Sequence, residues 1–278
     1  MSISEMSNNR IRFCILFAVI LCGTASARPQ EENAQFQSLN NKPVIQALQP
    51  RAANSYSCNT IEYTCQSIGS LASPNGVTFI DGLTGWIVGN SGTIIHTTDG
   101  GVNWNPQSSG ISNNLADVKF FDARNGVITG NAGIILRTTD GGAAWNKQTS
   151  GTVLNLYSLS VLSHTVAIAA GDSGIILRSS DGGTTRSPVA SGVFSALTSI
   201  SFKDSLNGII VGWNNTILRT TDAGLDWRTL SGPQLPASSI LQCVSYGKPG
   251  RILFSARVKS DYGYEQLIAV SSPNNGSN

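Results

Sequence analysis

The chain has 278 residues, of which 40% are hydrophobic and only 12% are charged, and it contains 29 glycines. This composition is typical of an all-β protein with many turns, and it excludes a disordered chain or a helical bundle. The net charge of +2 is too small to indicate a nucleic-acid binder, so we expect no nucleic-acid partner.

Residues 1–27 have the pattern of a secretory signal peptide. Arg10 and Arg12 precede an apolar run over residues 13–22, and a small-residue cleavage site ends at Ala27. A retained membrane anchor is the alternative, but the run is only about half of the roughly 20 residues that a span needs. The two arginines are not a twin-arginine pair, so we expect Sec-type export to the periplasm or the extracellular space, or to the thylakoid lumen if the host is photosynthetic.

Residues 28–57 are rich in Gln, Asn and Pro and are predicted to be a flexible leader. The cysteines that follow the signal are Cys58, Cys65 and Cys243. Cys58 and Cys65 are close in sequence and are the candidate disulfide pair, which leaves Cys243 either as a free thiol or as a competitor for Cys65. Because the chain has only two histidines and no paired-cysteine motif, we expect no metal site and no cofactor.

A motif with a period of 41 residues organises the rest of the chain, with Asp99, Asp140, Asp181 and Asp222 at equivalent positions. Each copy holds four short apolar stretches separated by glycine turns, and the third stretch is apolar on both faces. Four strands in about 40 residues is the size of one β-propeller blade. Strands are predicted at 76–80, 86–88, 93–97 and after Trp104, with equivalents in the later copies.

The two ends of the repeat region suggest how a ring would close. Residues 63–69 match the fourth strand of the later copies, whereas 240–246, 251–256 and 266–271 look like first, second and third strands without a fourth. We therefore predict an all-β propeller of about five four-stranded blades over residues 58–272, closed by the N-terminal strand completing the last blade. Residues 273–278 form a tail.

The repeated [Ser/Thr]-x-Asp-x-Gly-x-x-Trp pattern is an Asp box, and we expect it to be structural. The Asp accepts hydrogen bonds from its own turn, the Gly permits a positive φ, and the Trp packs the turn onto its blade. The third copy has Arg186 in place of Trp, so its turn should be the least well anchored. The Asp-box residues are Asp99, Gly101, Trp104, Asp140, Gly142, Trp145, Asp181, Gly183, Asp222, Gly224 and Trp227.

The copies GTIIHTTDGGVNW and GIILRTTDGGAAW resemble the repeat of the photosystem II stability/assembly factor family, within the wider Asp-box (BNR) propellers. The resemblance covers residues 70–230 clearly and 58–271 weakly. It implies a non-catalytic, extracytoplasmic scaffold that binds another protein, with a membrane-protein complex as one class of partner. The chain departs from the family, which usually has about seven blades, and we expect a monomer.

One repeated basic position is a candidate binding feature. His96, Arg137, Arg178 and Arg219 each lie three residues before an Asp-box aspartate, so in a ring they would form an arc of positive charge for an anionic partner. Alternatively, each side chain covers the neighbouring blade and pairs with an aspartate such as Asp122 or Asp204.

The loops that enter each first strand are the candidate specificity elements, since variable loops on a rigid frame carry most recognition. Two other functions stay open. A lectin-like propeller could bind glycans, with Trp86 and Trp213 as platforms, although the repeat places both in the second strand, which favours core packing. A sialidase-like glycoside hydrolase would need a pair of carboxylates, and the aspartates lie mostly in structural turns, so we expect no enzyme. The loop residues that could give an apolar rim, and that turn packing explains equally well, are Leu154, Leu156, Tyr157, Phe194 and Leu235.

Overall fold

The computed structural model describes residues 73–232, 235–246, 252–260 and 263–272. The predicted signal peptide, the leader, Cys58, Cys65, the strand at 63–69 and the tail at 273–278 lie outside the described residues. Within the described residues, no helix has the length and apolar character needed to cross a bilayer.

The described chain is all-β and folds as a series of antiparallel sheets, as the composition predicted. Sheet 1 contains β1 (Pro74–Phe79), β2 (Gly85–Gly89), β3 (Ile94–Thr97) and β4 (Asn105–Gln107), and sheet 2 contains β5 (Leu115–Phe120), β6 (Gly126–Gly130), β7 (Ile135–Thr138) and β8 (Asn146–Gln148). Sheet 3 contains β9 (Leu156–Val161), β10 (Ala167–Gly171), β11 (Ile176–Ser179) and β12 (Ser187–Val189). Sheet 4 contains β13 (Leu197–Phe202), β14 (Gly208–Gly212), β15 (Ile217–Thr220) and β16 (Arg228–Thr229), and sheet 5 contains β17 (Ile240–Tyr246), β18 (Ile252–Ser260) and β19 (Gly263–Ser272).

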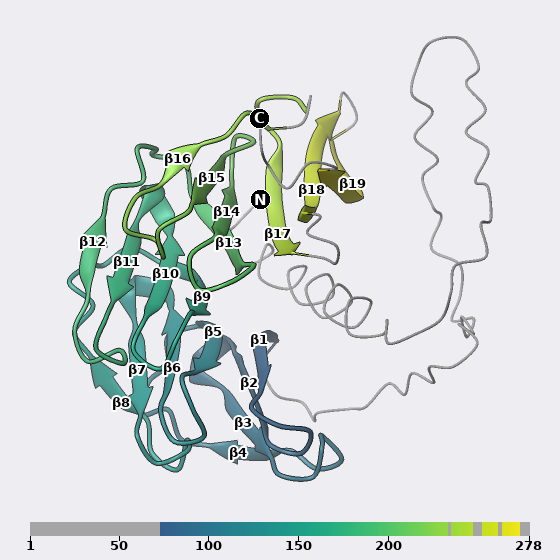
Figure 1. The fold of residues 1–278 in the computed structure, drawn as a ribbon. Helices are drawn as coiled ribbons and strands as arrows, with labels where there is room; N and C mark the ends of the chain where they lie inside the picture. The colour runs from purple at the N-terminus through teal and green to yellow at the C-terminus, as the bar shows by residue number, and fades with distance from the viewer. Residues whose placement is uncertain (1–72, 233–234, 247–251, 261–262, 273–278) are drawn as a thin grey trace, which may run out of the picture.

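The sheets follow one another in an arc, with sheet 1 at one end and sheet 5 at the other (Figure 1). The first strands β1, β5, β9, β13 and β17 contact one another in succession, so they form the inner side of the arc. The arrangement is that of propeller blades, and the described part of sheet 5 has three strands where the others have four.

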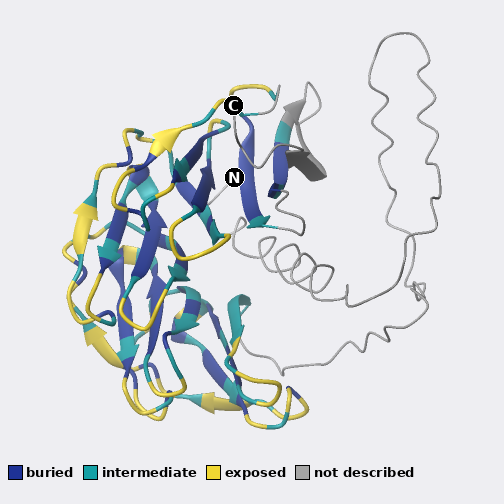
Figure 2. Ribbon diagram, viewed as in Figure 1, coloured by how far each residue is buried: buried dark blue, intermediate teal, exposed yellow. Residues whose placement is uncertain are grey.

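The core consists of layers between neighbouring sheets. Trp86 and Ile94 of sheet 1 pack against Leu115, Ile128 and Leu136 of sheet 2, and equivalent clusters join each later pair of sheets. The middle strands are therefore buried on both faces, as their continuous apolar runs indicated, whereas the last strands β4, β8, β12 and β16 are largely exposed (Figure 2). At about 1.5–3 kcal/mol for each large buried side chain, these layers supply the main stabilisation.

Side chains on the inner strands also tie each sheet to the next. Asp117 Oδ2 accepts a hydrogen bond of 2.9 Å from the Leu159 amide, and Ser158 Oγ accepts one of 3.2 Å from the Ile200 amide. The same link recurs between Ser199 and the next sheet. A register shift in β5 between Leu115 and Asp117 accompanies this arrangement, as expected for a bulge that re-aims a side chain.

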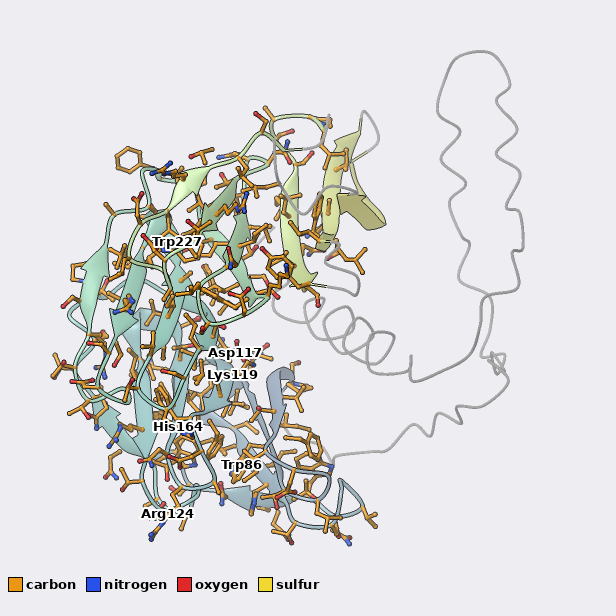
Figure 3. The ribbon with its side chains drawn as sticks, in the orientation of Figure 1. Trp86, Asp117, Lys119, Arg124, His164 and Trp227 are labelled. Carbon is orange, nitrogen blue, oxygen red and sulfur yellow. The ribbon has the colours of Figure 1, made fainter. Side chains whose placement is uncertain are left out.

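The up-and-down order of strands gives the arc two distinct ends. One end, the Asp-box end, carries the turns between first and second strands and between third and fourth strands, and Gly141 donates its amide proton to Arg124 O across them. The other end, the loop end, carries the turns between second and third strands and the entry loops. Figure 3 labels Arg124 and His164, which lie in Asp-box-end turns, and Asp117 and Lys119, which lie on β5.

Cys243 lies on β17, is 5% exposed and is disulfide-bonded. The free-thiol alternative for this residue is therefore wrong. Its partner is not among the described residues, because Cys243 is the one cysteine they contain.

Candidate functional site

The four Asp-box turns share one hydrogen-bonding pattern, shown here for the second. Thr138 Oγ1 donates to Asp140 Oδ1 at 2.7 Å and accepts the Gly142 amide at 2.9 Å. Asp140 Oδ1 accepts the Ala144 amide at 3.0 Å. The carboxylate of each box thus closes its own turn, and the equivalent bonds occur at Asp99, Asp181 and Asp222.

These hydrogen bonds hold the aspartates in the ionised form. The Asn103 amide and side chain, with Thr97, lower the pKa of Asp99 to about 2. Burial raises the pKa of Asp181, but hydrogen bonds from Thr185 and Ser179 outweigh it, and the pKa falls to about 2. Carboxylates with such values are unsuited to donate a proton near neutral pH.

The Asp-box turns of sheets 2, 3 and 4 also pack against the preceding sheet. Gly142 has φ +83°, and a Cβ there would lie 2.6 Å from Trp86 Nε1 of sheet 1. The Gly224 turn packs in the same close way against Ile168 of sheet 3. The box tryptophan Trp145 is 8% exposed and packs edge-on against Phe120 with centroids 5.9 Å apart. The motif therefore forms a contact between sheets as well as a turn within one.

The third Asp box differs because Arg186 stands where the others have tryptophan. Its guanidinium donates to Thr149 O of sheet 2 and to Gly183 O of its own turn. Hydrogen bonds thus anchor this turn in place of a ring. That it is the least well anchored of the four turns stays a prediction. A cavity of about 20 Å³ remains beside Arg186 between sheets 2 and 3, lined by residues that include Val127 and Thr129. That volume is enough for about one water molecule.

The repeated basic position lies in the seams between sheets. Arg137 Nε donates to Gly182 O at 3.0 Å, and Arg178 Nε donates to Ala223 O at 3.0 Å. In each case a half-buried guanidinium binds the Asp-box turn of the next sheet. Arg219 lies at the equivalent place on β15. Burial raises the pKa of Tyr246 in sheet 5, and the charge of Arg219 partly offsets this by lowering it. These arginines are thus partly committed to holding neighbouring sheets together.

The expected pairing with aspartates holds only indirectly for Arg137. Its Nη2 approaches Asn125 Oδ1 at 3.5 Å, and Asn125 Nδ2 in turn donates to Asp122. Ion pairs among the described residues include Lys119–Asp117 and Arg228–Asp226.

His96 differs from the arginines at the same repeat position. Its ring stacks on Trp86 with centroids 4.6 Å apart, and its Nε2 is buried without a hydrogen-bond partner. Burial lowers the pKa of His96 below 6.5, so the side chain is neutral at pH 7 and adds no positive charge to the arc.

The entry loops at the loop end are held rigidly by one repeated device. Ser150 Oγ donates to Thr152 O at 3.0 Å and accepts the Thr152 amide at 3.3 Å. A Cβ added at Gly133 would lie only 2.0 Å from Thr152 O. Ser109 and Ser191 hold the neighbouring loops in the same way.

The apolar rim predicted for these loops is present only in part. Phe194 is 94% exposed, but Leu156 is fully buried in the core, and Tyr157 donates its hydroxyl to Asp172. Val153, which the sequence analysis missed, is 84% exposed and lies one 41-residue repeat before Phe194. The shared repeat position was the signal that could have found it.

The two proposed sugar platforms lie in different surroundings. Trp86 is 1% exposed and is sandwiched between His96 and Phe120, so it is a core residue. Trp213 is half-buried and lies in the turn after β14, outside the strand in which the repeat had placed it. In the described part of the chain, no group of three or more His, Cys, Asp or Glu side chains could hold a metal ion.

One family of known proteins matches this chain in sequence. Residues 57–185 match the family model described as photosynthesis system II assembly factor YCF48. The repeat region is thus similar to the photosystem II assembly-factor-like BNR propellers over somewhat less than half of the chain. A search for sequence relatives among curated proteins finds no match.

Solved structures of YCF48 share the fold. The structure titled YCF48 bound to D1 peptide is 21% identical, with a TM-score of 0.56 over 70% of this chain and 67% of that one. YCF48 from Cyanidioschyzon merolae is 16% identical, with a TM-score of 0.52 over 70% of each chain. At these identities the likeness shows the fold alone.

Enzymes also occur among the structural neighbours. The GH74 xyloglucanase from Xanthomonas campestris is 14% identical, with a TM-score of 0.55 over 69% of this chain. This chain covers only 35% of that enzyme, so the likeness is to part of a larger propeller enzyme and shows the fold alone. The assembly-factor-like match is the one supported by both sequence and fold.

Proposed function

We propose that this chain is a non-catalytic, exported propeller that binds another protein, as a member of the assembly-factor-like family. The family match over residues 57–185 carries the proposal. A structural relative of that family is titled as bound to a D1 peptide, which makes a segment of a membrane-protein complex the class of partner proposed here.

The state of the aspartates supports a non-catalytic role. Hydrolysis of a glycoside needs one carboxyl group that can donate a proton and a second that acts as nucleophile or base. The Asp-box carboxylates accept hydrogen bonds from amide groups of their own turns, and Asp99 and Asp181 have pKa values of about 2. These groups serve the fold, and protein binding needs no proton donor.

The disulfide at Cys243 supports both export and ring closure. Disulfides persist in oxidising compartments outside the cytoplasm, in agreement with the predicted signal peptide. After cleavage at Ala27 the remaining partners are Cys58 and Cys65. Either would bring the predicted strand at 63–69 close to sheet 5, whose described part has three strands. We propose that this strand completes the fifth blade.

Parallel binding assays on the mature chain, residues 28–278, test the proposal. The chain is applied to an array of peptides tiling the extracytoplasmic segments of host membrane proteins, with the D1 peptide included, and to a glycan array. Saturable binding to a peptide with no glycan signal is expected. Glycan binding without peptide binding would replace the proposal with the lectin-like function.

A further inference from the structure

The seam between sheets 2 and 3 lacks large side chains that the neighbouring seams contain. In sheets 1, 2 and 4 a phenylalanine packs edge-on against the Asp-box tryptophan, as Phe120 does against Trp145. One repeat later, sheet 3 has Val161 and Arg186 at these two positions. Sheet 3 also has Ala169 where sheets 2 and 4 have isoleucine. All three residues are smaller than their counterparts, and two of them, Ala169 and Arg186, line the cavity of about 20 Å³.

A buried hydroxyl group borders the same cavity. Thr129 on β6 is fully buried and lines the cavity, and its Oγ1 has no hydrogen-bond partner among the described residues. The repeat equivalents of Thr129 in sheets 1, 3 and 4 are Val88, Ala170 and Val211. A buried hydroxyl without a partner is unfavourable, and a methyl group at the same place would avoid that cost. The hydroxyl therefore points to a polar partner inside the cavity.

Arg186 supplies a second polar group beside the cavity. Its Nη1 donates to Thr149 O, and its Nη2 donates to Gly183 O and Thr184 O. A guanidinium group has five N–H donors, so these bonds leave two of them for another acceptor. Most of the other lining side chains are apolar. A buried water molecule needs at least two polar partners and a volume of at least about 10–15 Å³, and this cavity offers both.

We infer that one structural water molecule binds in this cavity and bridges Thr129 Oγ1 and the Arg186 guanidinium. The water oxygen accepts an N–H of Arg186, and the Thr129 hydroxyl either donates to the water or accepts from it. The bridge joins β6 of sheet 2 to the Asp-box turn of sheet 3, where the neighbouring seams have ring contacts. An anion fits less well, because the carboxylate of Asp181 already opposes the charge of Arg186 and the lining is mostly apolar.

A crystal structure of the exported full chain, at a resolution that shows ordered water, tests the inference. Density for a single water oxygen within about 3.2 Å of both Thr129 Oγ1 and an Arg186 nitrogen is expected. Crystals soaked in bromide give the matching control, since an anomalous peak at this position would replace the water with a halide site. A cavity without density would also overturn the inference.

The substitution Thr129→Val gives a test in solution, because the two outcomes differ in sign. If the water is bound, the variant removes one of its two contacts and should lower the melting temperature by about 2–4 °C. The reference is Thr198→Val, which removes a buried hydroxyl that donates to Val211 O at 3.0 Å and should cause a loss of similar size. An unchanged or raised melting temperature for Thr129→Val would mean that the hydroxyl had no partner, and would overturn the inference.

Discussion

The contact between an Asp-box turn and the preceding sheet predicts that Gly142→Ala destabilises the protein more than Gly151→Ala. Both glycines have positive φ, +83° for Gly142 and +78° for Gly151, so an alanine at either costs about 1–2 kcal/mol of backbone strain. The difference lies in their surroundings. A Cβ at Gly142 would stand 2.6 Å from Trp86 Nε1, whereas at Gly151 nothing lies within 4 Å.

Trp86 cannot easily move away, because its ring is stacked between His96 and Phe120 with centroids 4.6 and 4.1 Å away. Overpacking against such a ring costs about 1–3 kcal/mol. Gly142→Ala should therefore lower the free energy of unfolding by about 2–5 kcal/mol and Gly151→Ala by only about 1–2 kcal/mol. Urea unfolding of both variants measures the difference. Equal losses would refute the claim that the Asp box joins sheets, and would reduce it to a local turn.

Further substitutions test the other contacts. Arg178→Gln removes the donor to Ala223 O and should lower the free energy of unfolding by about 1–2 kcal/mol. Arg228→Gln, at an exposed ion pair, should change it by less than about 0.5 kcal/mol. An equal effect of the two variants in thermal unfolding would argue against a role of Arg178 in holding neighbouring sheets together. Arg186→Ala removes the donors to Thr149 O and Gly183 O and should lower the free energy of unfolding by about 1–3 kcal/mol; an unchanged melting temperature would mean that these hydrogen bonds do not anchor the third turn. Asp99 and Asp181 have folded pKa values of about 2 against 3.8 for the free group, so their contribution to stability is complete above about pH 4 and is lost as the pH falls toward 2. The melting temperature of Asp99→Asn should therefore fall less than that of the wild type over this interval, and parallel curves would contradict the pKa values.

The repeat period made much of the fold predictable from the sequence. The spacing of Asp99, Asp140, Asp181 and Asp222 placed the strands, and the doubly apolar third strand correctly predicted a sheet packed on both faces. Such patterns lie within one repeat, so they can be recognised from a single sequence. Blade number and closure depend on residues outside the described part of the chain and stay predictions.

The candidate site was less predictable because it depends on contacts between repeats. Nothing within one repeat shows that Arg137 binds the carbonyl of Gly182, 45 residues away in the next sheet. The sequence also does not separate Leu156, the buried first residue of β9, from Phe194, which is exposed in an entry loop, since both are apolar residues near the start of a first strand. Only the path of each loop over the preceding turn decides which side chain faces solvent.

Cross-linking mass spectrometry on the exported chain in its native host tests the central claim most directly. The account predicts cross-links to the extracytoplasmic segments of one membrane-protein complex, formed from residues of the propeller. Cross-links only to cytoplasmic proteins, or turnover of a polysaccharide by the purified mature chain, would contradict a non-catalytic exported protein-binding propeller.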